Sequence, residues 1–188
     1  MIKNANIFYC KRKVGKTEVS LDFIVNKIMK SNDKLNICYF APNKVMSIRV
    51  KSRLIEKLIN KNIISSEKDL LVNNKNLLTL KDGTNIFFKV DTFDIQTAFR
   101  GFNFNYIILD EFSFFNQLRL VEIIENMQVM NVDGLLMMST PDNKDMSYLE
   151  QLIKDRSVNF SRKEINSTEF LNLNKLFLSD AIKKILSF

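Results

Sequence analysis

The stretch Cys10-Lys11-Arg12-Lys13-Val14-Gly15-Lys16-Thr17 decides the fold that this sequence predicts. It follows the apolar residues Ile7-Phe8-Tyr9 and precedes a helical pattern, so that a strand, a loop and a helix come in this order. It fits the phosphate-binding pattern G-x-x-x-x-G-K-[ST] except at the first glycine, which Cys10 replaces. Taken alone, so short a match is equally compatible with a solvated turn.

Phosphate binding by this loop has a simple physical basis. Backbone N–H groups at the start of a helix attract anions, the helix dipole adds positive potential, and a lysine reaches the β- and γ-phosphates of a nucleotide. A threonine hydroxyl beside that lysine is a ligand for Mg²⁺. We therefore expect ATP and Mg²⁺ as cofactors, with Thr17 as a metal ligand. The expected nucleotide-binding residues are Lys11, Arg12, Lys13, Val14, Gly15, Lys16 and Thr17.

A second motif consists of the apolar run Tyr106-Ile107-Ile108-Leu109 followed by Asp110-Glu111, and the run is typical of a strand buried on both faces. In an ATPase, Asp110 would hold Mg²⁺ and Glu111 would orient and polarise the attacking water, because phosphoryl transfer depends on position and charge. The alternative is an acidic helix start, at which the dipole stabilises both carboxylates. The upstream loop with Lys16 favours the ATPase interpretation.

Two further candidates leave alternatives open. Arg12 lies inside the loop, where a guanidinium either stabilises developing charge on the γ-phosphate or only adds electrostatic attraction for phosphate. Ser139-Thr140-Pro141 follows the apolar run from Leu135 to Met138. Its hydroxyls either sense the γ-phosphate or belong to an ordinary turn begun by the proline, and spacing alone favours the turn.

Apolar strands alternate with helical patterns along most of the chain. Strands are expected at 35–40, 106–109 and 135–138, and a helix is expected over about 116–129. Two further helices are expected, one from Lys16 and one after Pro42. The apolar side of the first is expected to carry Leu21, Ile24, Val25, Ile28 and Met29, and that of the second Val45, Ile48, Ile55, Leu58 and Ile59. Asp82-Gly83 between the runs 77–80 and 85–90 predicts a β-hairpin. The predicted fold is α/β: a three-layer P-loop NTPase, RecA/ASCE-like, with a mainly parallel central sheet and a β-hairpin insertion. Such sheets bind ligands at the carboxyl ends of their strands, where all three motifs fall.

Composition narrows the class of protein. The 188 residues suffice for one domain with a real core, and the chain has no histidine and two cysteines without C-x-x-C spacing, which argues against a zinc site or a Ser-His triad. The apolar runs are much shorter than the ~20 residues of a membrane span. We expect a soluble intracellular protein with no signal peptide and no membrane partner.

The net charge of +7 favours a polyanionic partner. Basic residues gather in the first loop and again in the segment 43–62, where Arg49, Lys51 and Arg53 are candidates for DNA binding. A solvated helix face in a lysine-rich protein explains the second group at least as well.

Together these motifs resemble the ATPase domain of viral and phage terminase large subunits, the motors that drive DNA into preformed capsids. That family's loop commonly lacks the first glycine and carries an arginine at the place of Arg12. Its Asp-Glu pair often follows an Arg-Gly, here Arg100-Gly101, and a hairpin similar to that around Asp82-Gly83 precedes it. Its coupling motif frequently reads Ser-Thr-Pro, as in Ser139-Thr140-Pro141. The resemblance covers roughly residues 5–155.

The resemblance implies roles and partners. It makes Lys16 and Arg12 catalytic together with Glu111, gives Thr17 and Asp110 to the metal, and assigns Ser139 and Thr140 to the coupling of hydrolysis to movement. It implies a DNA-stimulated ATPase that translocates double-stranded DNA into a viral capsid as a homo-oligomeric ring on a portal, in the cytoplasm of an infected host cell. A small terminase subunit and a separate nuclease subunit are further candidate partners.

The expected layout is an ATPase domain over residues 1–157 and a C-terminal extension over 158–188 that packs on it and ends in a helix capped by Ser179. The extension lies where the family has the linker to a nuclease domain, so an ATPase-only or split form is expected. One alternative is a RecA-like lobe of a superfamily 2 helicase or translocase, which needs a second lobe. The other is a non-hydrolysing nucleotide-binding assembly protein, against which Lys16, Asp110 and Glu111 speak.

Overall fold

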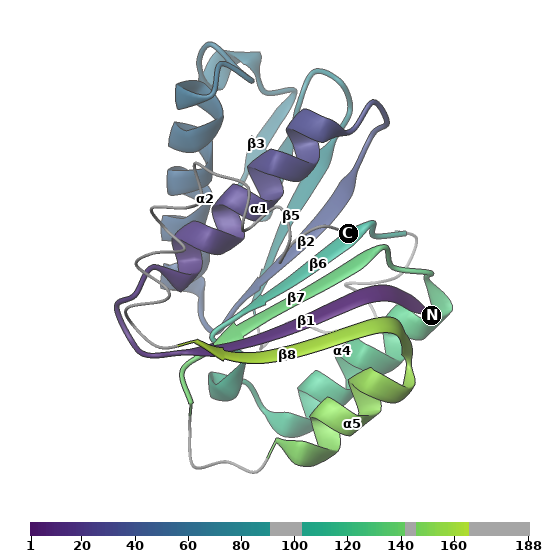
Figure 1. The fold of residues 1–188 in the computed structure, drawn as a ribbon. Helices are drawn as coiled ribbons and strands as arrows, with labels where there is room; N and C mark the ends of the chain where they lie inside the picture. The colour runs from purple at the N-terminus through teal and green to yellow at the C-terminus, as the bar shows by residue number, and fades with distance from the viewer. Residues whose placement is uncertain (91–102, 142–145, 166–188) are drawn as a thin grey trace.

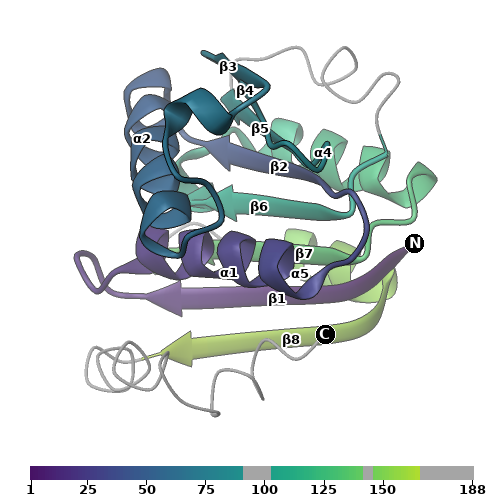
Figure 2. The ribbon, with the colours of Figure 1, turned by 90° about the horizontal axis from the view of Figure 1, so that it is seen from above.

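A computed structural model describes residues 1–90, 103–141 and 146–165 (Figure 1). They form a single sheet of eight strands in the order β3-β4-β5-β2-β6-β7-β1-β8, with helices on both faces (Figure 2). The strands are β1 (Ile2–Cys10), β2 (Asn36–Ala41), β3 (Val72–Asn74), β4 (Leu77–Thr79), β5 (Asn85–Val90), β6 (Tyr106–Asp110), β7 (Gly134–Ser139) and β8 (Ser157–Ile165).

The sheet is mainly parallel. Each neighbouring pair from β5 to β8 in the sheet order is parallel, whereas β3-β4 and β4-β5 are antiparallel. The hairpin expected around Asp82-Gly83 is β4-β5, in which Leu78 pairs with Ile86. The three-layer architecture with a parallel sheet and a hairpin is therefore confirmed. Because β7 lies between β1 and β6, the strands that precede the two main motifs are not direct neighbours.

Two helix pairs cover the sheet (Figures 1 and 2). The helices are α1 (Lys16–Lys30), α2 (Lys44–Asn60), α4 (Gln117–Val129) and α5 (Ser147–Asp155), with short 3-10 turns η1 (Glu67–Asp69) and η2 (Phe112–Phe114). On one face, the buried side chains of α1 and α2 pack on Ile37 and Tyr39 of β2. On the other, α4 and α5 pack with Cys38 and Phe40. This alternation along one strand produces the two apolar cores of a three-layer domain. None of the described helices is long and apolar enough to cross a membrane.

The buried stripe of α2 differs from the expected one. The side chains of Val45 and Ile48, expected on the apolar face, are 58% and 49% exposed. Ile55 and Leu58, also expected on that face, are buried as expected, together with Val50 and Leu54. Apolar residues occupy more than half of the circumference of α2, so their periodicity predicts a helix but does not decide which stripe faces the sheet.

β8, the last strand in the sheet order, was not expected from the sequence pattern. β8 pairs in parallel with β1, from Ile2 opposite Ser157 to Cys10 opposite Ile165. The sheet thus continues beyond residue 157, where the ATPase domain was expected to end. The remainder of the expected extension, including Ser179, and the segment with Arg100-Gly101 lie outside the described residues.

Candidate active site

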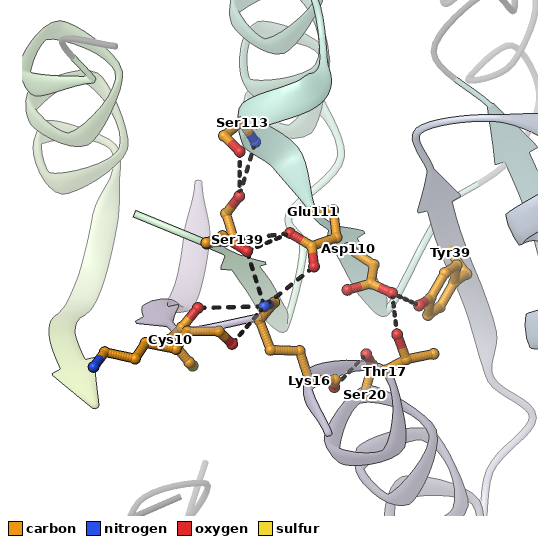
Figure 3. A network of polar contacts seen from close by, with 11 residues as sticks. Cys10, Lys16, Thr17, Ser20, Tyr39, Asp110, Glu111, Ser113 and Ser139 are labelled. Carbon is orange, nitrogen blue, oxygen red and sulfur yellow. Dashed lines mark hydrogen bonds and ion pairs between the residues drawn. The ribbon is translucent and has the colours of Figure 1, made fainter. Parts of the chain in front are cut away.

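The site lies where β1, β6 and β7 end and α1 begins (Figure 3). These three strands are parallel and consecutive in the sheet order β6-β7-β1, so their carboxyl ends meet at one edge. The register places Cys10 one residue beyond the pair Tyr9–Ser139, and Asp110 opposite Met138. The fold therefore brings the three sequence motifs together, as expected for a ligand site of such a sheet.

The loop between β1 and α1 has two residues in the left-handed backbone region, Lys13 with φ 62° and Gly15 with φ 101°. Gly15 adopts this conformation without a steric penalty, because it lacks a Cβ atom. Cys10 stands at the template's first glycine, but it is the last residue of the extended strand β1 and its side chain is buried in the core. Burial raises the pKa of the Cys10 thiol to about 11, so the thiol stays protonated at neutral pH. The missing glycine is thus explained by the position of Cys10 in the strand.

The start of α1 differs from the starts of α2 and α4. Asn43 caps α2 by accepting a hydrogen bond from the N–H of Met46 at 3.0 Å, and Asn116 caps α4 by accepting one from Leu118 at 2.9 Å. α1 begins at Lys16, and its N-cap residue Gly15 provides no side-chain cap, as is also true of Met146 at the start of α5. Its first N–H groups and the positive end of its dipole suit an anion.

Lys16 is at the centre of the polar network (Figure 3). Its side chain is only 4% exposed, and its ammonium donates to the carbonyls of Cys10 at 3.3 Å and Lys11 at 3.0 Å. It also donates to Thr140 Oγ1 at 3.1 Å and forms an ion pair with Glu111 Oε1 at 3.1 Å. One buried cation therefore contacts all three motifs, with Glu111 as its counter-charge.

Asp110 is the last residue of β6 and its side chain is fully buried. Its Oδ2 accepts hydrogen bonds from Thr17 Oγ1 at 2.9 Å and from the Tyr39 hydroxyl at 2.5 Å. Its Oδ1 is buried and has no hydrogen-bond partner in the described part of the chain. Burial raises the pKa of Asp110. An unpartnered buried carboxylate oxygen next to a threonine hydroxyl fits the oxygen ligands that Mg²⁺ prefers.

Glu111 has a left-handed backbone with φ 53° and ψ 47°. Its Oε2 accepts hydrogen bonds from the backbone N–H of Thr140 at 3.2 Å and from Thr140 Oγ1 at 3.3 Å. A non-glycine residue in this region costs on the order of 1 kcal/mol or more and is typical of functional sites. The turn directs the carboxylate of Glu111 away from the strand axis and toward Lys16 and β7.

The two candidate coupling residues have different surroundings. Thr140 contacts both Lys16 and Glu111. Ser139 is buried, donates to the Ser113 hydroxyl at 2.6 Å and accepts from the Ser113 N–H at 3.1 Å. Ser139 therefore connects β7 to η2, whereas Thr140 belongs to the polar network around the lysine. Their role in coupling stays a prediction.

The basic side chains of the loop lie at the surface. Lys11, Arg12 and Lys13 are exposed. The guanidinium of Arg12 lies 5.8 Å from the centre of the Phe114 ring, a cation–π contact to the turn that follows Glu111. Arg12 is thus placed beside the segment that carries the candidate catalytic carboxylate, and its contact with nucleotide stays a prediction.

The three candidate DNA-binding residues are all on α2. Arg53 forms an ion pair with Glu18 of α1, and Lys51 donates to the carbonyl of Asn74. Arg49 is exposed. Two of the three cations thus have contacts within the domain, and their role in DNA binding stays a prediction.

Tyr39 is a contact of the site that the sequence motifs do not include. It lies in β2, which was predicted as a buried apolar strand, and its hydroxyl reaches Asp110 across to the neighbouring strand β6. A tyrosine in a strand expected to be buried does indicate a polar contact, because the hydroxyl of a buried tyrosine usually has a hydrogen-bond partner. The identity of that partner depends on the strand order, which the sequence pattern does not give.

The architecture is similar to solved phage large terminases. The large terminase ATPase domain of Thermus phage P74-26 is 14% identical with a TM-score of 0.65, over 97% of this chain and 82% of that chain. The large terminase of bacteriophage HK97 is 16% identical with a TM-score of 0.64, over 86% of this chain and 35% of that chain. At these identities the likeness shows a common RecA-like fold.

A large terminase from a thermophilic bacteriophage is 13% identical with a TM-score of 0.63, over 96% of this chain and 46% of that chain. This chain therefore spans about half the length of that protein. The same terminase has been solved in complex with ADP and with ATP-gamma-S. A search of curated proteins gave no match.

A family match covers most of the chain. Residues 7–180 match the family described as "Terminase large subunit, T4likevirus-type, N-terminal". The matched range includes the loop with Lys16, the Asp110-Glu111 pair and Thr140. The chain belongs to this family of terminase large-subunit N-terminal domains.

Proposed function

We propose that the chain hydrolyses ATP and uses the energy to move double-stranded DNA into a viral capsid. The observation that carries this proposal is the convergence of Lys16, Thr17, Asp110, Glu111 and Thr140 at one edge of the sheet. The chain's membership in the terminase family and the nucleotide complexes of a related large terminase support it.

In this proposal each residue has a defined task. The N–H groups at the start of α1 hold phosphate oxygens, and the ammonium of Lys16 neutralises charge on the β- and γ-phosphates. Glu111 orients the attacking water and accepts its proton, at a carboxylate held by Thr140. The exposed guanidinium of Arg12 acts on the same chain's γ-phosphate.

Mg²⁺ fits the residues present. The hydroxyl of Thr17 and the carboxylate of Asp110 would hold the ion, which would supply positive charge to the nucleotide phosphates when bound. A site with so few protein ligands is typical of Mg²⁺ bound together with a nucleotide.

Membership in the terminase family supports a proposal for the assembly. The working form is a homo-oligomeric ring on a portal in the cytoplasm of the infected host cell, with double-stranded DNA as the substrate that moves. A small terminase subunit and a nuclease activity, carried by this protein or by another chain, would complete the machine.

The test measures ATP binding and phosphate release separately, with and without double-stranded DNA. We expect hydrolysis that double-stranded DNA stimulates. Lys16→Ala should lose ATP binding, because the phosphates lose their buried counter-charge. Glu111→Gln should retain ATP binding but lose hydrolysis by about 100-fold or more, because general-base catalysis contributes that much.

Matched controls are available on the same fold. Lys30→Ala removes a lysine from the far end of α1, and Glu122→Gln neutralises an exposed carboxylate on α4; both should leave hydrolysis unchanged. Hydrolysis by Lys16→Ala at the parent rate would contradict the phosphate assignment. Bound ATP without phosphate release in the parent would favour an assembly protein, and stimulation by single-stranded DNA alone would favour a helicase.

A further inference from the structure

We infer that Tyr39 is a positioning residue for Asp110: its buried hydroxyl fixes one oxygen of the carboxylate so that the other is presented to Mg²⁺. Figure 3 shows Tyr39 and Thr17 converging on the same side of the Asp110 carboxylate. The inference rests on the proposed function, because Mg²⁺ at this site would be bound together with ATP.

The strand register explains how Tyr39 reaches Asp110. Tyr39 of β2 is paired with Ile108 of β6, and side chains two residues apart on a strand share a face. Asp110 therefore projects on the same face as Ile108 and Tyr39, toward α1. The long phenol side chain extends past Ile108 to the end of β6, with its ring centre 6.3 Å from that of Phe88.

The two hydrogen bonds restrain the carboxylate in a defined way. Both donors bind Oδ2, one from β2 at 2.5 Å and one from the first turn of α1 at 2.9 Å. Two donors from separate elements on one oxygen limit rotation of the carboxylate plane. Oδ1 is left buried, without a hydrogen-bond partner among the described residues. Thr17 can donate its proton to Asp110 while a lone pair of its oxygen faces a metal ion.

Packing alone does not account for a hydroxyl at this position. The chain has 16 phenylalanines and four tyrosines, and both Phe40 and Phe88 lie in the same part of the sheet. A phenylalanine would fill nearly the same volume at position 39. The side chain of Tyr39 is fully buried, so its hydroxyl requires a partner inside the protein, and Asp110 accepts the hydrogen bond that it donates. Outer-shell partners of this kind orient metal ligands.

The experiment uses Tyr39→Phe and measures metal binding directly. A fluorescent ADP is bound to the protein without metal, and Mg²⁺ is then titrated in. We expect Tyr39→Phe to bind metal-free ADP as the parent does and to weaken the apparent Mg²⁺ affinity about tenfold, the lower range for loss of an outer-shell partner. Asp110→Ala should abolish the response to Mg²⁺.

Tyr9→Phe is the matched control. Tyr9 is also buried, and its hydroxyl donates at 2.6 Å to Glu150 Oε1, in the core on the opposite face of the sheet. Removing that hydroxyl should leave the Mg²⁺ affinity unchanged. An unchanged Mg²⁺ affinity in Tyr39→Phe, with the response lost in Asp110→Ala, would overturn the inference and leave the proposed function intact. A parent protein that binds no nucleotide would instead overturn the proposed function.

A second measurement does not depend on the folding of Tyr39→Phe. The four tyrosines of the unsubstituted chain are replaced by 3-fluorotyrosine, and fluorine NMR follows the addition of Mg²⁺ to the ADP complex. The resonance of Tyr39 should shift when Mg²⁺ is added. Three single variants, Tyr9→Phe, Tyr106→Phe and Tyr148→Phe, each remove one resonance, and the resonance that all three retain belongs to Tyr39. A Tyr39 resonance whose chemical shift does not change on addition of Mg²⁺ would contradict the inference.

Discussion

Several single residues in the site lower the stability of the folded protein, and favourable contacts elsewhere in the fold have to offset this. Asp110 is fully buried with an unpartnered oxygen in the described part of the chain, and burial raises its pKa. Lys13 and Glu111 have left-handed backbones without being glycine. Features of this kind persist where binding or catalysis requires them, at the expense of stability.

Asp110→Asn should therefore stabilise the ligand-free protein at neutral pH. The amide oxygen can still accept the hydrogen bonds from Tyr39 and Thr17, while the cost of burying a charge disappears. We expect the free energy of unfolding in urea to rise by about 1 kcal/mol. The same substitution at Asp133, whose carboxylate pairs with Lys3 at 2.6 Å near the surface, should not stabilise the protein. A lower stability of Asp110→Asn would contradict this account.

Some residues of the site could be predicted from sequence motifs, whereas some of the contacts between them could not. Lys16, Thr17, Asp110 and Glu111 belong to motifs whose spacing carries a chemical meaning, and the structure places them together. The ion pair between Lys16 and Glu111 and the contact from Tyr39 did not follow. They join side chains far apart in the chain, and only the order of strands in the sheet brings these close.

At the scale of elements, apolar periodicity predicted that a helix or strand forms better than it predicted which of its side chains are buried. The helices with buried residues such as Ile24 and Leu120 were expected, yet Met29, counted on the apolar face of α1, is 57% exposed. β3 has two exposed residues in a polar segment, and β8 alternates weakly. Edge strands with little burial lack the apolar pattern that identifies strands in the centre of a sheet.

At the C-terminal end of α2, the backbone conformation of Asn62 limits which residue types fit at this position. Asn62 follows the cap residue Lys61 with φ 56°, its N–H donates to Ile59 O at 2.9 Å, and the N–H of Ile63 donates to Leu58 O at 2.9 Å. These two bonds define a Schellman motif, in which the left-handed position favours glycine or asparagine.

Two substitutions at Asn62 test this assignment. Asn62→Gly should be more stable than Asn62→Ala by about 1 kcal/mol, because only the alanine has a Cβ atom in the left-handed region. At Lys61, with φ −94°, the order should not hold, and alanine should be at least as stable as glycine. Urea unfolding of the four variants gives the comparison. Equal stabilities of glycine and alanine at position 62 would exclude the motif.

At the scale of the whole molecule, stability should be graded across the sheet. β7 is buried along its full length and bonded on both sides, by β1 and β6. β3 is the first strand in the sheet order and two of its residues are exposed. Amide protection follows burial and hydrogen bonding, so the elements should open at different free energies.

Hydrogen exchange measured by mass spectrometry should show this gradient. We expect peptides from β6 and β7 to exchange most slowly, and those from β3 and β8 to exchange faster. Within the helices, the half of α1 that carries Ile24 and Val25 should be protected, since both side chains are buried. Protection of β3 equal to that of β7 would mean that the sheet opens only as one unit.

The strand order also has a consequence for synthesis on the ribosome. β1 is the first described strand to be made, but its neighbours β7 and β8 are the last. The nascent loop between β1 and α1 gains a neighbouring strand only when translation has passed Ser139, on the order of ten seconds later at roughly 5–20 residues per second. During that interval Ile7 and Phe8 are apolar residues without their final neighbours, and exposed apolar residues of this kind make a chain prone to aggregation. Among the described strands, the one that leads into Lys16 is thus made before both of the strands that pair with it.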